Sequence, residues 1–265
     1  MGATSGERYA VASCHVERPL DDAVWSRFSA LQEARPGGFA IAALMRPPDP
    51  AFGEDEALWT QRAREAAEHG PLGHHTHWTA PDHARPTSDE TGARVLEEGR
   101  RFRETGLKPT IFCGGGWYTD LEVAEACAAL GYVDCTPRWS RPPYLASGER
   151  WASLGFPARV RLPSGRILHA IPTMYSIGDL ARIVFRFNVR RRMPRRSTPD
   201  SRGDLPPMVH VYFHDTDLLD RRRRTVLLFL LRVLALRRPP TDLDSLGLLM
   251  DDDDPEIAWD DVTRL

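Results

Sequence analysis

Apolar positions recur along the chain with two different spacings, which predict alternating strands and helices. Short apolar runs bounded by Gly, Pro or polar residues predict β-strands at 9–15, 39–45, 71–77, 108–113, 131–136 and 208–214. Longer runs with helical spacing predict α-helices at 20–34, 55–68, 87–105, 119–130, 176–187 and 217–237. Within this series we expect Asp120 to begin one helix and Gly131 to end it. The alternation is typical of an α/β fold.

One segment interrupts the alternation. The stretch "ARVRLPSGRILHAIP" at 158–172 has alternating apolar positions on both sides of "PSG", which predicts an inserted β-hairpin. Long polar loops are expected at 78–90 and 193–207. We therefore predict one domain over residues 1–249, followed by an acidic tail at 250–265 that is solvated and disordered.

Three of the predicted strands carry titratable side chains at their carboxyl ends. Residues two apart on a strand share a face, so each strand delivers its polar groups together. The sets are His15 with Glu17, His75 with His77, and His210 with Tyr212 and His214. In α/β folds the carboxyl ends of the strands build the functional site, so we expect these groups to converge there.

Composition and charge narrow the class of protein. The chain has 265 residues, 42% of them hydrophobic, which is enough for one large α/β domain with a substantial core. With 35 basic and 37 acidic residues its net charge is -2, which argues against a nucleic-acid binder. The start has no apolar secretion segment and the four cysteines have no CxxC spacing, so we predict a cytoplasmic protein. The longest apolar run, 225–236, is too short for a transmembrane helix.

The order of these pieces resembles the polysaccharide deacetylase family, the NodB-homology fold of carbohydrate esterase family 4. "LGHHTHWTAP" is similar to the third-strand motif of that family, with His75 and Thr76 in the His-Ser/Thr places. "VYFHDTD" resembles the last motif, with His214 in the place of the catalytic histidine. The resemblance extends over about residues 9–247 and implies a distorted (β/α) barrel of about seven strands, with the hairpin as an insert.

The sequence departs from the family pattern at several chemically important positions. "SCHVERP" stands where the family has "TFDDGP" and is closer to a branch with "DVE", which places His15 on the base aspartate and Glu17 on an acidic metal ligand. Thr79 occupies the place of the second metal histidine. "FCGGGWYTD" at 112–120 places Cys113 where the family has the arginine that orients the base.

The resemblance implies a divalent metal, and the donor types favour zinc while leaving other divalent ions open. Our candidate ligands are Glu17, His75 and His77, because His77 shares a face with His75 and replaces the histidine missing at 79. His15 is the candidate base and His214 the candidate acid. Neighbouring side chains expected to contact the substrate are Trp78, Trp117, Tyr118, His210 and Tyr212.

Two functions follow from the resemblance and its departures. The first is a metal-dependent hydrolase that removes an N-acetyl or N-formyl group from a sugar or glycan precursor. The alternative is a catalytically inactive deacetylase-like barrel that binds a carbohydrate or a partner protein. The lost base aspartate, metal histidine and arginine motivate this alternative.

Two arginine-rich segments stand apart from these motifs. Residues 182–196 and 220–238 interleave arginine with large apolar residues. We expect the second to be an outer helix with its apolar stripe on the sheet. As an alternative, the two segments form a cationic surface for a phosphate-linked sugar or an anionic membrane leaflet, and the acidic tail packs against them.

Overall fold

A curved, mostly parallel β-sheet forms the centre of the molecule in the computed structural model, which describes residues 8–87, 89–146, 148–149, 151–182, 208–250 and 255–264. The strands of the main sheet are β1 (Tyr9–Val16), β2 (Ala42–Met45), β3 (Leu72–Thr76), β4 (Ile111–Gly114), β5 (Val133–Asp134), β7 (Ala158–Arg161), β8 (Ile167–Ala170), β9 (Tyr175–Ser176), β10 (Met208–His214) and β11 (Glu256–Ala258). A separate pair is formed by β6 (Trp151–Ala152) and β12 (Thr263–Arg264).

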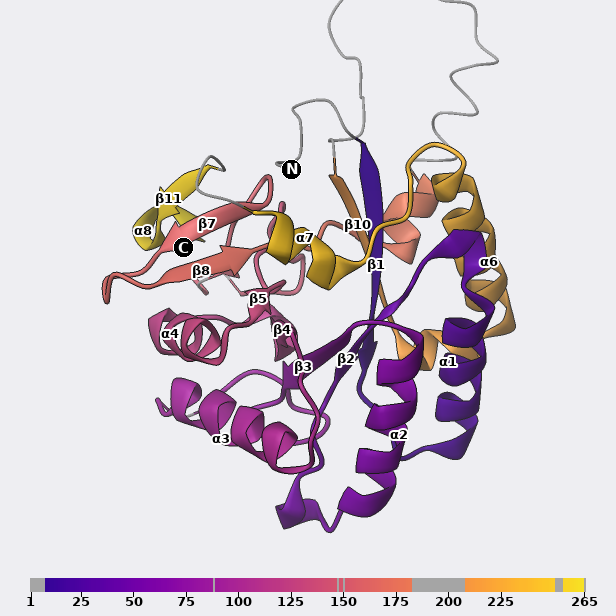
Figure 1. Cartoon of the computed structure of the whole chain (residues 1–265), viewed down its shortest axis with the longest axis horizontal. Coiled ribbons are helices and arrows are strands. Elements are labelled where there is room, and N and C mark those ends of the chain that lie inside the picture. Colours follow the sequence, from indigo (N-terminus) through magenta and orange to yellow (C-terminus); the bar gives the residue numbers. More distant parts are fainter. Residues whose placement is uncertain are drawn as a thin grey trace, which may run out of the picture.

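Helices surround the sheet. The α-helices are α1 (Asp22–Ala34), α2 (Glu56–His69), α3 (Thr91–Glu104), α4 (Leu121–Leu130), α6 (Arg221–Ala235), α7 (Leu243–Leu249) and α8 (Trp259–Val262), and residues 177–182 are also helical. Figure 1 shows α6, α1, α2, α3 and α4 following one another around the outside of the sheet. Short 3₁₀ turns lie at Pro36–Gly38, Pro50–Phe52, Gly115–Trp117 and Asp215–Leu219. The predicted α/β alternation is confirmed.

The strand order differs from that of a closed barrel. The order is β11-β7-β8-β5-β4-β3-β2-β1-β10-β9, and all neighbours are parallel except β7 and β8, which form the expected antiparallel hairpin. Among the described residues β11 and β9 are unpaired edges, so the sheet is open and has ten strands rather than about seven. The hairpin and β11 extend the sheet beyond β5. The edge formed by β11 therefore does not pair with β9 to close a barrel.

Aspartates begin four of the helices. The side chain of Asp120 accepts a hydrogen bond from the backbone N–H of Val123, as the sequence predicts, and Gly131 ends the same helix with a φ of 73°. Asp21, Asp55 and Asp220 accept equivalent bonds at the starts of α1, α2 and α6. Each cap satisfies backbone donors that the first helical turn leaves free, which explains why these helices begin where they do.

The apolar face of β10 packs into the main core. Val209, Val211 and Phe213 are buried, in the same cluster as Leu227 and Leu231 of α6. This matches the expected outer helix with an apolar stripe, and it leaves the alternate residues of β10 for the other face of the strand. The second arginine-rich segment is therefore largely a packing helix, while 183–196 of the first, and the loop expected at 193–207, lie outside the described residues.

The C-terminal segment is packed rather than solvated. Residues of β11 pair with β7, and those of β12 pair with β6. Trp259 is 7% exposed and Val262 is fully buried, both against the apolar side of the hairpin. The expectation of a disordered tail was wrong for residues 255–264. The tail is acidic overall, but Trp259 and Val262 bury apolar surface and fix it to the domain.

Replacing Trp259 with alanine is therefore expected to destabilise the fold by about 3–5 kcal/mol, since it leaves a cavity under the hairpin. Urea unfolding followed by circular dichroism measures the change. The matched control is Phe156→Ala, because Phe156 is 48% exposed, and its effect should stay within about 0.5 kcal/mol. Equal unfolding midpoints for Trp259→Ala and wild type would show that the segment does not stabilise the domain.

Candidate metal centre

The carboxyl ends of β1, β3 and β10 lie at one edge of the sheet. His15 on β1 is directly opposite His214 on β10, and His75 on β3 is opposite Cys113 on β4. Parallel pairing aligns the carboxyl ends, so side chains that are far apart in sequence meet there.

Glu17 is the point where three histidines meet. Its Oε1 lies 3.9 Å from Nε2 of His75, 3.9 Å from Nε2 of His77 and 3.6 Å from Nε2 of His214. The two Nε2 atoms of His75 and His77 are 3.2 Å apart. The structure thus brings together the residues that we selected as ligands and the candidate acid.

Backbone carbonyls orient two of these rings. Nδ1 of His75 donates to the carbonyl oxygen of Cys113 at 2.7 Å, and Nδ1 of His77 donates to that of Pro81 at 2.8 Å. A carbonyl can only accept, so each Nδ1 carries a proton, and the neutral tautomer selected in this way directs an Nε2 lone pair toward Glu17. Such carbonyl contacts are the usual support of metal-binding histidines.

This donor set fits a divalent cation. Two lone pairs 3.2 Å apart beside a carboxylate repel one another unless a proton or a metal ion lies between them. Burial, together with His75, lowers the pKa of His77 to about 4, which disfavours the proton near neutral pH. In tetrahedral zinc sites, bonds of about 2.0–2.2 Å place neighbouring ligand atoms about 3.3–3.6 Å apart, close to the distances here.

Two overlapping groups of donors lie beside this set. The ligand atoms of His15, His75 and Cys113, and those of His15, Glu17 and His214, also lie within 4.8 Å of one another. The set of Glu17, His75 and His77 is favoured because both of its histidines have a carbonyl partner on Nδ1.

Electrostatics keep Glu17 ionised. Burial alone would raise the pKa of Glu17, but its interactions with His75, His214 and His77 outweigh burial and lower the pKa to about 2. A carboxylate that is charged over the whole physiological range is suited to hold a cation.

His15 lies behind the ligands in an aromatic environment. Its ring centroid is 4.6 Å from that of His75, 5.0 Å from that of Trp117 and 5.1 Å from that of His214. Its Nε2 is 3.8 Å from Sγ of Cys113. Burial first, and then neighbouring His75 and His214, lower the pKa of His15 well below its usual range, so the ring is neutral and able to accept a proton.

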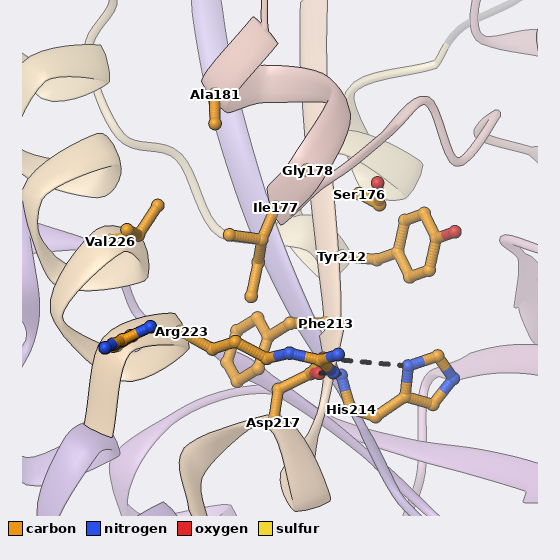
Figure 2. Close-up of a pocket in the computed structure, with 11 residues that line it drawn as sticks. Ser176, Ile177, Gly178, Ala181, Tyr212, Phe213, His214, Asp217, Arg223 and Val226 are labelled. Atoms are coloured by element: carbon orange, nitrogen blue, oxygen red, sulfur yellow. Dashed lines mark hydrogen bonds and ion pairs between the residues drawn. The ribbon is translucent and has the colours of Figure 1, made fainter. Parts of the chain in front are cut away.

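His214 is the most open of the central histidines, with 38% of its side chain exposed. Its Nδ1 is 3.9 Å from Oδ2 of Asp217, whose other oxygen accepts from Arg223. Figure 2 shows His214 and Tyr212 on one side of β10, with Phe213 on the other, at the edge of a pocket of about 470 Å³. The pocket, lined by Ile177, Phe213 and Val226 among others, leads to His214 from solvent.

The proposed substrate-contacting residues divide into two groups. Tyr212 and Trp117 flank His15, and Tyr118 is half-buried with its hydroxyl donating to Asp120. His210 and Trp78 face the interior: His210 is fully buried, and Trp78 donates to the carbonyl of Thr91 and packs on Tyr118. The geometry therefore gives no support to direct substrate contact by His210 or Trp78.

His210 is a buried residue of β10 that contacts neighbouring strand and loop residues rather than the candidate ligands. Its Nε2 is 2.8 Å from Oγ of Ser13, and its Nδ1 is 3.3 Å from the carbonyl oxygen of Pro172. Burial lowers the pKa of His210 to about 3. The unfolded chain binds this proton near pH 6.5, so the stability that the neutral ring contributes is complete above pH 6.5 and is lost as pH falls toward 3.

When the pH falls from about 7.5 to about 5, the free energy of unfolding of wild type should therefore decrease by about 2 kcal/mol more than that of His210→Gln. Glutamine keeps a partner for Ser13 but does not titrate. Urea unfolding at both pH values measures the difference, with exposed His83→Gln as a control that should behave as wild type. An identical loss in wild type and His210→Gln would exclude this contribution.

The other face of β3 is held by a buried polar network. Nε2 of His74 is 2.8 Å from Oε2 of Glu98 on α3, and Oγ1 of Thr76 donates to the same oxygen at 2.8 Å. His74 thus faces away from the candidate site. The network fixes β3 and so directs His75 to the opposite side.

Sequence reasoning did not single out three features of the site. Gly115 allows the chain to pass close to His77, because an added Cβ would lie 2.8 Å from Cδ2 of that ring. Asp217 beside His214 and Arg138 beside Trp117 were also not selected. The triple glycine was the available signal for the first, since glycine permits close approach of backbone; the other two have no local signal.

Comparison with known proteins identifies the fold. The structure matches a "putative polysaccharide deacetylase" from Mycobacterium smegmatis with a TM-score of 0.62 and 12% identity, covering 94% of this chain and 92% of that one. A 4-alpha-glucanotransferase from Thermococcus litoralis matches at a TM-score of 0.48 and 12% identity, covering 97% of this chain and 40% of that one. No protein-family model and no curated protein matches the sequence. The chain therefore has a polysaccharide deacetylase-like α/β fold, and the expected structural resemblance is confirmed.

Within the described part of the chain, none of the helices combines the length and apolar character needed to cross a bilayer.

Proposed function

We propose that this protein is a metal-dependent hydrolase that removes an N-acetyl or N-formyl group from a sugar or glycan precursor. The observation that carries the proposal is the pair of inward-facing Nε2 atoms of His75 and His77, 3.2 Å apart beside Glu17. The deacetylase-like fold supports the same reading, because the ligands lie at the carboxyl edge of its sheet.

Glu17, His75 and His77 would hold the cation, with zinc favoured by the donor types. When bound, a divalent cation supplies a Lewis acid for an amide carbonyl and lowers the pKa of a nearby water molecule. His15, a neutral ring, accepts the proton of the attacking water, and His214 donates a proton to the leaving amine. Glu17 and Asp217 lie on either side of His214, with carboxylate oxygens 3.6 Å from its Nε2 and 3.9 Å from its Nδ1.

The surroundings suit a carbohydrate. Tyr212 and Trp117 present aromatic surface beside His15. Tyr118, which directly follows Trp117, contributes a third ring. A cytoplasmic location belongs to the same proposal, supported by the four cysteines, which are all free and buried.

Metal analysis combined with an acyl-release assay tests the proposal. Purified protein is stripped with a chelator, reloaded separately with zinc, manganese or cobalt, and analysed by mass spectrometry for bound metal. It is then incubated with N-acetylated and N-formylated sugars while released acetate or formate is measured. We expect about one equivalent of metal and metal-dependent release; uptake below about a tenth of an equivalent would overturn the proposal.

The second candidate, a non-catalytic glycan-binding protein, is favoured by one observation. His15 stands in the place of the base, its pKa is held well below the usual range by burial, and Sγ of Cys113 lies 3.8 Å from its Nε2. A base with so low a pKa removes protons weakly. Metal binding with glycan binding but no acyl release from any sugar would favour this candidate over the hydrolase.

A further inference from the structure

Two of the side-chain nitrogens of Arg138 are buried without a hydrogen-bonding partner. Arg138 is only 4% exposed, and its Nε and Nη1 atoms are buried with no acceptor. No carboxylate of the described residues forms an ion pair with it. Burying a guanidinium under these conditions costs stability, because the donors lose water and gain no replacement.

Other buried arginines in the described part of the chain have partners. Arg46, equally buried, pairs with Glu54, and Arg62 pairs with Asp22. The fold therefore supplies acceptors where an arginine serves only packing. The missing acceptor at Arg138 points to a group that the described residues do not provide.

Arg138 lies in the aromatic wall of the candidate site. Its Cζ is 4.4 Å from the ring centroid of Trp117 and 4.8 Å from that of Tyr212. Both rings in turn flank His15, at 5.0 and 5.7 Å between centroids. The cluster thus connects Arg138 to the candidate base through two direct ring contacts.

The two aromatic rings cannot replace an acceptor. Cation–π contact stabilises the positive charge over the faces of the rings. The N–H donors of a guanidinium lie in its own plane and match the paired oxygens of a carboxylate or phosphate. The two rings therefore hold Arg138 in place without satisfying its Nε and Nη1 donors.

We propose that Arg138 binds an anionic group of the substrate, a carboxylate or phosphate oxyanion carried by the N-acylated sugar. The inference rests on the proposed function only in placing that sugar in the same site. In this arrangement Trp117 and Tyr212 position the guanidinium of Arg138. The guanidinium then makes the protein select acidic sugars over neutral ones.

Inorganic phosphate is the first probe, applied to chelator-treated protein so that metal and turnover play no part. Thermal unfolding and calorimetric titration are measured for wild type and Arg138→Met at matched ionic strength. We expect phosphate to bind wild type and raise its Tm, and Arg138→Met to bind at least about tenfold more weakly. Identical responses of the two proteins would overturn the proposal.

Two further variants keep the result interpretable. Arg138→Lys keeps the charge but loses the paired donors, so its phosphate affinity should fall between those of wild type and Arg138→Met. Arg85→Met is the matched control, because Arg85 also stacks on an aromatic ring, that of Tyr118, but donates to the carbonyl oxygen of Gly116. It should bind phosphate as wild type does, and an equal loss in Arg85→Met would contradict a specific role for Arg138.

Sugar probes then identify the source of the anion. Binding of N-acetylglucosamine, its 1-phosphate and N-acetylmuramic acid is compared in metal-free wild type and Arg138→Met. Preference of wild type for either acidic sugar, lost in the variant, supports the proposal and identifies phosphate or carboxylate. Equal binding of all three by wild type would overturn it. Because no step here needs metal or catalysis, failure of acyl release would leave this result intact.

Discussion

Replacing His75 with alanine is expected to abolish metal retention and acyl release together. Its Nε2 faces both Glu17 and His77, and its Nδ1 is already committed to the carbonyl of Cys113, so no other atom of the ring can compensate. Loss of an outer-sphere partner already costs about 10–100-fold in metal affinity, so loss of a ligand should cost at least about 100-fold. Metal content after dialysis and rates of acyl release measure the two effects.

The pattern among variants is more informative than one variant alone. Glu17→Gln and His77→Ala should lose metal in the same way, since each removes one of the three donors. The control is His83→Ala, because His83 is exposed and donates its backbone N–H within the loop rather than to the site. Metal content equal to wild type in all three ligand variants would exclude this set as the metal centre.

Replacing His214 with asparagine is expected to reduce kcat by about 10²–10⁴-fold while metal stays bound. The partly exposed ring lies at the edge of the pocket (Figure 2), with its Nε2 3.6 Å from Glu17 and its Nδ1 3.9 Å from Asp217. Steady-state kinetics on metal-loaded protein, with metal content determined in the same sample, separate catalysis from metal loss.

Two companion results decide the role of His214. Asp217→Asn should have a smaller effect, because Asp217 acts only through the neighbouring imidazole. If His214→Asn instead loses its metal, His214 is a ligand, together with His15 and Glu17, and the assignment as acid is wrong. Unchanged kcat in His214→Asn would exclude both roles.

Local patterns in the sequence were sufficient for most of the fold. Apolar spacing predicted the main strands and helices, and the alternation around "PSG" predicted the hairpin of β7 and β8. Asp120 and Gly131 were recognisable because capping depends on neighbours within a few residues. Strand periodicity likewise placed His75 and His77 on one face, since that period is a local property of the backbone.

Long-range contacts decided the rest. The C-terminal segment joins the sheet beside β7 because Trp259 packs against the hairpin. That hairpin surface exists only after folding, so the sequence alone could not predict the pairing. The same is true of the open sheet, whose edges depend on pairing between segments distant in sequence.

By itself, therefore, the sequence determined an α/β chain with histidines and Glu17 at neighbouring strand ends, because those features follow from residue type and local periodicity. The tertiary structure alone decided the state of these groups. The carbonyls of Cys113 and Pro81 set the tautomers of the two central histidines, and two aromatic rings orient Arg138 without pairing it. Protonation, tautomer and hydrogen-bond satisfaction depend on atoms brought together from separate strands and loops, and no local pattern of residues encodes them.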